Sequence, residues 1–412
     1  MSIAPGDSID LIIESLAYRG QGIARHEGLV VFVAGVAPGE RVRVRISRLH
    51  RNYAEAQLLE VQEPSADRIA PDCRLPDGTH VPGCVYDHLT YTAEVAQKQR
   101  QLEDFLRRLP GAAPLAFLPP LPSPRERHYR NKIVLHAQLP LPAALPRLGY
   151  VGDDNRTVLE IPACPLARDE INTALAAFRQ APEFRRLRDG DAVTFRWTAA
   201  DGAIEWAEVR AGPPDPPPPE YLTEQAPFGP VRVPAAGFYQ VNPEVATELV
   251  RQVTAWFSAA GGGDLLDLYC GAGIFAIACA RAGARRTAGI ESGRVAVAAA
   301  VENAHFHHVQ VRFDCQEMRA AARAKFGEFP MTDTTVIVDP PRQGLEPEVA
   351  QALVAAQPRR ICYVSCDPAT LTRDLKLILP AGYALRAARL FDMFPRTAHF
   401  EMAVWLENRE SE

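Results

Sequence analysis

The stretch YVSCDPATLTRDL, residues 363–375, places Cys366 where an apolar strand ends and a segment with helical spacing begins. Asp367 follows as a residue type that caps helices, and Pro368 suits the first helical position. A thiol beside the positive end of a helix is stabilised as the thiolate, the nucleophilic form of cysteine. Most cysteines are inert core residues, but this setting makes Cys366 a candidate nucleophile.

Two other segments carry acids next to strand ends. VDPPRQGL, residues 338–345, sets Asp339 and two prolines directly after an apolar strand, which predicts a rigid turn that presents side chains. Ligands bind at the carboxyl edge of open α/β sheets, where this turn and Cys366 are both expected. Further on, MFPRTAHFE, residues 393–401, places Glu401 at the start of a final strand.

A glycine-bearing turn in LDLYCGAGIFAIACA, residues 266–280, predicts a nucleotide site. Gly271 and Gly273 allow a ligand close to the backbone, although an ordinary tight turn would also explain them. About twenty residues on, Glu291 ends the next strand, where a carboxylate can accept hydrogen bonds from ribose hydroxyls. The full dinucleotide pattern is absent, so the pair favours an adenosine-type cofactor, and S-adenosylmethionine suits it best. Asp314, after the third strand, could meet the adenine edge or be a loop acid.

The elements that must position these residues alternate from about residue 226 onward. Apolar strands such as DLLDLYC, TVIVD and RICYVSC are separated by helical segments such as FAIACARAG, EPEVAQALVAA and PATLTRDLKLIL. Such alternation is typical of a doubly wound parallel sheet. The fold class predicted for residues 226–412 is therefore α/β, a Rossmann-like domain.

Two other regions precede that domain. Residues 1–62 contain short β-rich runs, and within them RVRVRI alternates so that Arg41, Arg43 and Arg45 share one face of a strand. This face is either a solvated edge or a surface that follows phosphates on a small β-barrel. Residues 63–225 form a mixed central domain with a cysteine-bearing loop, a basic cluster at 123–132 and a Pro-rich linker at 212–220.

Composition bounds the class of protein. The 412 residues are 47% hydrophobic and 23% charged, as in a globular protein, and the formal net charge is −5. The eight cysteines are expected to be thiols, because disulfides are rare in the cytosol. No secretory signal and no apolar run of membrane-spanning length are present, so we expect a soluble, cytoplasmic monomer.

The motifs together resemble those of a known family. FYQVNP, LDLYCGAG, VDPPRQGL, SCDPATLTRDL and MFPRTAHFE are similar to the five signatures of the S-adenosylmethionine-dependent RNA uracil-5-methyltransferases. Residues 1–62 also resemble the TRAM domain, an OB-like RNA-binding barrel. The resemblance implies Cys366 as nucleophile and Glu401 as base. It further implies cofactor or uracil contacts from four residues: Gln240, Tyr269, Glu291 and Asp339.

The implied reaction explains why a thiol is needed at this position. Carbon 5 of uracil is a poor nucleophile, and a thiolate that adds to carbon 6 makes carbon 5 able to attack a methyl group. A carboxylate must then remove the carbon 5 proton before the thiol is eliminated. The target base must leave its stack, which is easiest in a loop or single strand.

The chain departs from the family at two places. Ile274 stands in the glycine turn where an Asn is often found, which removes one expected hydrogen bond to the cofactor. Many members also hold an iron–sulfur cluster on four cysteines, whereas this chain offers Cys73, Cys84 and Cys164, with Val81 in place of the middle cysteine. His80 is a possible substitute ligand, and the three thiols could bind a cluster, zinc or nothing.

Several other functions remain open. A cytosine-5 methyltransferase would show Pro-Cys after the fourth strand, and an enzyme acting on exocyclic amines would show an aromatic residue where Arg342 stands. A small-molecule methyltransferase would not need the N-terminal arginine face. An RNA-binding or RNA-folding module without catalysis is the non-enzymatic alternative. For the RNA, the TRAM-like barrel favours 23S ribosomal RNA, with transfer RNA second.

Overall fold

The computed structural model describes residues 3–75, 78–110, 115–139, 145–152, 154–208 and 217–409. The chain divides into two compact units. Unit 1 consists of Met1–Asp104 and Phe394–His399, and unit 2 of Phe105–Met393 and Phe400–Glu412. Of the Pro-rich linker, residues 212–216 lie outside the described part. In the described residues, no helix is both long enough and apolar enough to cross a membrane.

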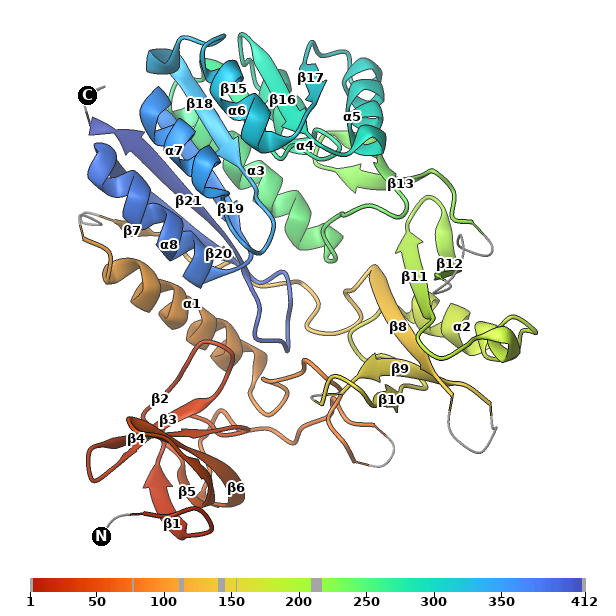
Figure 1. The fold of residues 1–412 in the computed structure, drawn as a ribbon, viewed down its shortest axis with the longest axis vertical. Helices are drawn as coiled ribbons and strands as arrows, with labels where there is room; N and C mark the ends of the chain where they lie inside the picture. Colours follow the sequence, from red (N-terminus) through yellow and green to blue (C-terminus); the bar gives the residue numbers. More distant parts are fainter. Residues whose placement is uncertain are drawn as a thin grey trace. The chain divides into compact units, whose positions relative to one another are not determined.

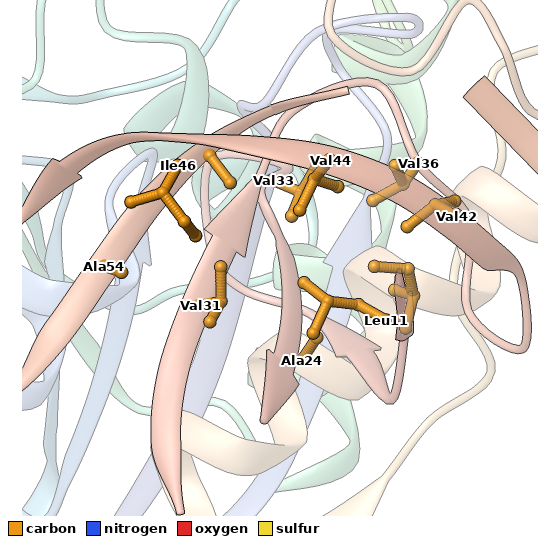
Figure 2. Packing of buried hydrophobic residues seen from close by; sticks show 11 residues of the cluster. Leu11, Ala24, Val31, Val33, Val36, Val42, Val44, Ile46 and Ala54 are labelled. Carbon is orange, nitrogen blue, oxygen red and sulfur yellow. The ribbon is translucent and has the colours of Figure 1, made fainter. Parts of the chain in front are cut away.

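The first part of unit 1 is a small β-barrel. Its strands occur in the order β1-β5-β6-β4-β3-β2. They are β1 (Ser8–Ile12), β2 (Ser15–Leu16), β3 (Gly22–His26), β4 (Leu29–Val33), β5 (Arg41–Leu49) and β6 (Tyr53–Glu63). The strict alternation of β5 has the predicted outcome: Val42, Val44 and Ile46 point into the core, as Figure 2 shows, and the arginines between them are exposed.

The second part of unit 1 is built around a buried group of charges on helix α1 (Tyr91–Arg107). Glu94 accepts hydrogen bonds from Lys98 Nζ at 2.8 Å and from the backbone N–H of Arg396 at 2.7 Å. The Arg396 guanidinium also lies 3.5 Å from Glu94 and donates to the Leu89 carbonyl at 2.7 Å. All three charged side chains are almost fully buried, so their pairing is what makes their burial tolerable.

Unit 2 begins with a mixed region around an antiparallel sheet of order β10-β9-β8-β11-β12. Its strands are β8 (Lys132–Gln138), β9 (Arg147–Val151), β10 (Val158–Glu160), β11 (Ala192–Thr198) and β12 (Gly202–Glu208), with helix α2 (Asp169–Phe178) packed on β11 and β12. A separate hairpin of β13 (Tyr221–Ala226) and β14 (Gly229–Pro234) follows.

The rest of unit 2 is the predicted α/β domain. One sheet of order β17-β16-β15-β18-β19-β21-β20-β7 contains β7 (Ala116–Phe117), β15 (Asp264–Leu268), β16 (Thr287–Glu291), β17 (Arg312–Cys315), β18 (Thr334–Val338), β19 (Arg360–Ser365), β20 (Tyr383–Phe391) and β21 (Glu401–Asn408). Strands β15 to β19 are mutually parallel where they pair, and β21 runs antiparallel to both β19 and β20. The sheet is therefore mixed, whereas the sequence predicted a parallel one.

Two groups of helices cover the sheet, as in other doubly wound folds (Figure 1). Helices α3 (Pro243–Ala259), α4 (Ile274–Arg281) and α5 (Arg294–Phe306) contact one another in series. Helices α6 (Met318–Phe326), α7 (Pro347–Ala356) and α8 (Pro368–Ile378) form a second series. Helix α6 and the short strand β7 were not predicted from the sequence.

Candidate active site

Cys366 lies directly after β19 and immediately before helix α8, as the sequence predicted. The Asp367 side chain caps this helix by accepting hydrogen bonds from the backbone N–H groups of Ala369 at 2.9 Å and Thr370 at 3.1 Å. Pro368 occupies the first helical position, where no N–H is required. The strand and the capped helix together fix the backbone that carries the thiol.

Glu401 comes to the same edge of the sheet from the far end of the sequence. Strand β21 pairs with β19 in an antiparallel register that joins Ser365 to Met402, so the next positions along, Cys366 and Glu401, adjoin each other. Glu401 is only 2% exposed. The Asp339 backbone N–H donates to the Leu268 carbonyl at 3.4 Å, which ties the turn after β18 to the end of β15.

The charges at this edge act on one another. Burial raises the pKa of Asp339 to about 7. Burial also holds the pKa of Glu401 well above its usual range, with a further rise from the charge of Asp339 and an opposing effect of Arg342. Two neighbouring carboxyl groups in a poorly solvated place cannot both ionise freely, so this pair retains a proton at a higher pH than free acids do.

The expected stabilisation of a Cys366 thiolate is wrong for the free protein. Burial, and then the negative charge of Glu401, raise the pKa of this thiol to about 12, against a smaller opposing effect of Arg342. The thiol is partly buried and faces more acids than cations, and these two effects outweigh the effect of the helix end. Cys366 is therefore protonated at rest and must lose its proton during any reaction.

The glycine turn after β15 has a left-handed backbone at three positions. Gly271 and Gly273 have φ values of +53° and +82°, and Tyr269 has a φ of +64°, which is rare for a side-chain-bearing residue. A Cβ atom on Gly273 would lie 2.6 Å from the Phe313 ring. Glu291, at the end of β16, accepts hydrogen bonds from the backbone N–H of Gly271 at 3.2 Å and of Gly293 at 2.7 Å.

Unpaired buried polar atoms mark this region as a binding site. Gln240 Oε1 is buried without a hydrogen-bond partner within the described residues, and the buried Tyr269 hydroxyl has only a weak contact with the backbone of Glu346. Buried polar groups in native proteins are nearly always paired, so these two atoms are explained most directly by a bound polar ligand. The glycine turn, the Glu291 carboxylate and these orphan atoms fit S-adenosylmethionine, which carries ribose hydroxyls, an amino acid moiety and an adenine.

Asp314 lies inside β17, and its surroundings differ from those expected of a free adenine contact. Its carboxylate lies 2.7 Å from the Lys325 ammonium group and 3.3 Å from the Arg312 guanidinium. Two cations already neutralise it. The structure therefore favours a structural ion pair, and any contact with adenine would have to share this carboxylate with Lys325.

The three loop thiols are divided between the two units. Cys73 and Cys84 belong to unit 1 and Cys164 to unit 2, and all three are buried. Among the described residues, no group of three or more His, Cys, Asp or Glu side chains is arranged to hold a metal ion. Cys164 Sγ instead accepts a hydrogen bond from the Tyr150 hydroxyl at 3.4 Å. A cluster is therefore not shown by the described residues, and no chemistry is assigned to one.

His80, the possible substitute ligand, and Val81, which stands in place of the middle cysteine, both have partners within the protein. The Val81 side chain is buried, and its backbone N–H donates to the Cys73 carbonyl at 2.9 Å. His80 Nδ1 lies 3.4 Å from the Asp87 carboxylate, which is almost fully buried. The loop is therefore held by apolar packing and backbone hydrogen bonds at the position where a metal ligand was expected.

The exposed arginines of the barrel differ in their partners. Arg43 binds Asp10 at 2.9 Å, and Arg41 lies 3.9 Å from Glu63. Arg45 pairs across the sheet with Ser8 and Gln57, and within the described part of the chain no carboxylate lies within 4 Å of its guanidinium. Of the three predicted phosphate contacts, Arg45 is thus the one whose charge remains uncompensated.

The basic cluster at 123–132 is largely engaged within the protein. Arg125 lies 3.6 Å from Glu244, and His128 lies 2.9 Å from Asp169. Asn131 donates to Glu224 at 3.2 Å and to the Gln240 carbonyl at 3.3 Å. These contacts make the cluster a support for the Gln240 loop.

Sequence reasoning missed two buried acids of this domain. Asp267 is fully buried in β15, where burial holds its pKa well above its usual range, and its Oδ2 accepts from the Ala276 N–H at 3.1 Å. Asp374 is 1% exposed on α8. The sequence indicates both, because each is an acid inside an otherwise apolar pattern. Asp267 lies in the strand sequence DLLDL, and Asp374 shares a helix face with Leu371, Leu375 and Ile378.

Comparisons with known proteins give consistent results. Residues 231–409 match a family model described as tRNA (Uracil-5-)-methyltransferase, and residues 4–59 match the TRAM domain model. A 23S rRNA (uracil(1939)-C(5))-methyltransferase of Acidithiobacillus ferrooxidans is 34% identical over 433 residues, which cover 96% of this chain and 97% of the relative. The same-named enzyme of Pseudomonas putida is 31% identical, with 96% and 93% covered.

Two other matches extend over nearly the whole chain. An uncharacterised RNA methyltransferase of Thermosynechococcus vestitus is 31% identical over 450 residues, with 96% of this chain and 97% of the relative covered. The crystal structure of Pyrococcus abyssi tRNA (uracil-54, C5)-methyltransferase, in complex with S-adenosyl-L-homocysteine, superimposes with a TM-score of 0.73 at 23% identity. It covers 97% of this chain and all of the other chain, and it shows that the fold is shared.

Proposed function

Because the chain belongs to the family of S-adenosylmethionine-dependent RNA uracil-5-methyltransferases, we propose that it methylates carbon 5 of a uridine through the thiol of Cys366. The observation that carries the proposal is the strand register that sets Cys366 beside Glu401 at one edge of the sheet. A nucleophile and a base are the two groups that this reaction requires of the protein.

The first half of the reaction depends on Cys366. Its sulfur bonds to carbon 6 of the uracil ring, and the electron pair of the carbon 5–carbon 6 double bond moves toward carbon 5 and the carbonyl at carbon 4. The thiol proton must leave as this bond forms, because the resting thiol has a pKa of about 12. The acids whose charges act on the thiol are Glu401, Asp339 and Asp367. We assign this proton to Asp339, because Asp367 caps helix α8 and Glu401 must be free to take the carbon 5 proton later.

The second half depends on Glu401. S-adenosylmethionine supplies the electrophilic methyl group, which carbon 5 takes up. Carbon 5 then carries both the methyl group and its original hydrogen. Glu401 removes that hydrogen as a proton, the double bond re-forms, and the carbon 6–sulfur bond breaks to release the thiolate. A carboxylate of raised pKa suits this step, because a stronger base removes a carbon-bound proton more readily.

The cofactor contacts follow from the orphan atoms and the glycine turn. We assign to S-adenosylmethionine the Tyr269 hydroxyl, Gln240 Oε1, the turn at Gly271 and Gly273, and the Glu291 carboxylate toward the ribose. Asp339 is assigned a place near the reacting methyl group and uracil. Asp314 keeps its proposed place near the adenine, shared with its ion pair to Lys325.

The proposed RNA is 23S ribosomal RNA. Two relatives that match nearly the full chain at 31–34% identity are named as methyltransferases of that RNA. The TRAM match at residues 4–59 supports an RNA-binding role for the barrel, with Arg45 as its phosphate contact. Transfer RNA is the second candidate, because the family model is described by that substrate.

Three further proposals concern the chain as a whole. We keep the division into a barrel at 1–62, a central domain at 63–225 and a catalytic domain at 226–412. We propose that the protein acts in the cytoplasm, because a relative is named as a methyltransferase of ribosomal RNA. We also propose that it acts as a monomer.

The experiment that tests the function is mass spectrometry of RNA from a strain that lacks the gene. Digests of 23S ribosomal RNA should lose one 5-methyluridine, and the purified protein with S-adenosylmethionine should restore it. Loss from transfer RNA alone would transfer the proposal to that substrate. Unchanged 5-methyluridine in both RNAs, with no methyl transfer by the purified protein, would overturn it.

A further inference from the structure

A buried acid on α8, Asp374, connects two segments of the candidate active site. Asp374 Oδ2 accepts a hydrogen bond from the backbone N–H of Leu345 at 2.8 Å and another from the Tyr363 hydroxyl at 2.7 Å. Leu345 ends the turn 339–345 that follows β18, and Tyr363 lies in β19, three residues before Cys366. One carboxylate therefore binds the acid-bearing turn and the thiol-bearing strand at the same time.

The neighbouring arginine completes the link. Arg373 Nε donates to Asp374 Oδ1 at 2.8 Å, and its guanidinium also donates to the Leu345 carbonyl at 3.1 Å. The backbone of Leu345 is thus held on its N–H side by Asp374 and on its C=O side by Arg373. Such a two-sided attachment holds both of the peptide units that flank Leu345.

The turn is shaped to reach this carboxylate. Gly344 has a φ of +75°, and a Cβ atom at this position would lie 2.7 Å from Asp374 Oδ2. Only glycine allows the backbone to approach so closely in this conformation. The other end of the turn is anchored by the hydrogen bond from the Asp339 N–H to the Leu268 carbonyl. Arg342 lies between these two anchored ends.

We propose that Asp374, with Tyr363, is the positioning residue that holds the turn 339–345 in the orientation that keeps Arg342 beside Cys366 and Glu401. The proposal rests on the proposed roles of these two residues in catalysis. Arg342 is the cation whose charge opposes the effects of Glu401, Asp339 and Asp367 on the thiol. A turn that loosened would move this charge away and leave the thiol among acids alone.

The test uses Asp374→Asn in the full-length protein. Asparagine has nearly the same shape, but its NH₂ group accepts no hydrogen bond. In the place of Oδ2 it loses the bonds from both the Leu345 N–H and the Tyr363 hydroxyl, and in the place of Oδ1 it loses the bond from Arg373. The alkylation rate of Cys366 by iodoacetamide, followed by mass spectrometry of its peptide at one fixed pH below the thiol pKa, should fall. A rise of one unit in the thiol pKa lowers the thiolate fraction about tenfold.

Methyl transfer provides the second readout. Single-turnover methylation of the RNA should slow by up to about 100-fold, as for small displacements of reacting groups, while S-adenosylhomocysteine binding stays unchanged. Tyr363→Phe removes only one of the two hydrogen bonds and should give a smaller effect in the same direction. Asp264→Asn is the matched control. That buried acid pairs with Arg286 at 2.6 Å at the start of β15, away from the carboxyl edge, so it should cost stability without slowing alkylation.

A double variant distinguishes positioning through Arg342 from general loosening. If Asp374 acts through Arg342, then in an Arg342→Gln background the Asp374→Asn change should add nothing to the loss of alkylation rate. Additive effects, or an alkylation rate that Asp374→Asn leaves unchanged while stability falls, would overturn the proposal. Alkylation is measured without RNA or cofactor, so a failure of the catalytic role of Cys366 would appear only in the methylation assay.

Discussion

Cys366 and Glu401 adjoin each other at one sheet edge although 34 intervening residues separate them in the chain, because β21 is inserted antiparallel between β19 and β20. The antiparallel direction is what brings the first residue of β21 to the carboxyl end of β19. A parallel strand at this position would begin at the opposite edge and would carry Glu401 away from the thiol.

The two halves of the reaction should separate in single variants. Cys366→Ala should abolish methylation and form no covalent RNA adduct, because no sulfur is present to add to carbon 6. In Glu401→Gln the thiol should still add to carbon 6 and carbon 5 should still be methylated. Elimination of the thiol should stall, so that a protein–RNA adduct accumulates. Denaturing gel electrophoresis with labelled RNA measures this adduct, and 5-fluorouridine in the RNA should trap the same adduct in the wild type.

Two results would contradict this assignment. A covalent adduct in Cys366→Ala would mean that another thiol reacts, and the exposed Cys315 would be tested next. Normal turnover by Glu401→Gln would assign removal of the carbon 5 proton to another group or to water.

Glu401→Gln should also change how stability depends on pH. The pKa of Glu401 in the folded protein is raised above its unfolded value, so the stability linked to this carboxyl is present at low pH and is lost as pH rises through the folded pKa. Glutamine does not ionise, and the variant should therefore gain stability relative to wild type as the pH is raised. Each unit of pKa shift corresponds to about 1.4 kcal/mol.

Thermal unfolding across a pH series measures this effect. Glu407→Gln is a useful control, because Glu407 lies on the same strand but is partly exposed and pairs with Arg386 at 3.2 Å. The stability difference between Glu401→Gln and wild type could instead stay constant from acid to alkaline pH. That result would argue against a raised pKa of the buried Glu401 carboxyl.

The barrel arginines should contribute unequally to RNA binding. Arg45→Ala should weaken binding and reduce the slope of log affinity against log salt by about 1, since one phosphate contact is lost. Arg43→Ala should have a smaller effect, because Asp10 already compensates that charge. Filter binding over a salt series compares the two, and Asp10→Asn should strengthen binding. Equal, negligible effects of both arginine changes would make this face a solvated edge of the barrel.

The loop thiols should be metal-free. Protein purified without oxygen should contain no iron and show no charge-transfer absorbance, because no group of metal ligands is found among the described residues and Cys164 accepts a hydrogen bond from the Tyr150 hydroxyl. Metal analysis and absorbance spectroscopy measure this. Iron together with a brown colour would support the hypothesis of an iron–sulfur cluster. One equivalent of zinc would instead indicate a site of three Cys and His80.

Local patterns in the sequence were sufficient for much of the site. Asp367 and Pro368 encode a helix start within three residues, and the alternation of β5 encodes two faces without reference to the rest of the chain. The family match at residues 231–409 and the TRAM match at residues 4–59 confirm the fold class predicted from the strand–helix alternation and the function implied by the resemblance of the motifs.

The parts that could not be predicted depend on contacts between distant segments. The place of β7 beside β20 joins residues near 116 to residues near 387, and no local pattern specifies it. The raised pKa of Cys366 likewise arises from burial and from Glu401, neither of which can be read from the helix start alone. Asp374 showed only as an acid in an apolar stripe, and its partners Leu345 and Tyr363 came from the fold.

The segment Phe394–His399 belongs to unit 1, although its neighbours in the chain, Met393 and Phe400, belong to unit 2. A gene fragment that encodes only residues 105–412 would therefore produce this segment without Glu94 and Lys98, which bind it. Since Glu401 follows the segment by two residues, exchange of the N-terminal region between relatives by recombination must preserve these partners. Helix α1 is thus inherited together with the proposed base, and a boundary for such an exchange would have to lie before this helix.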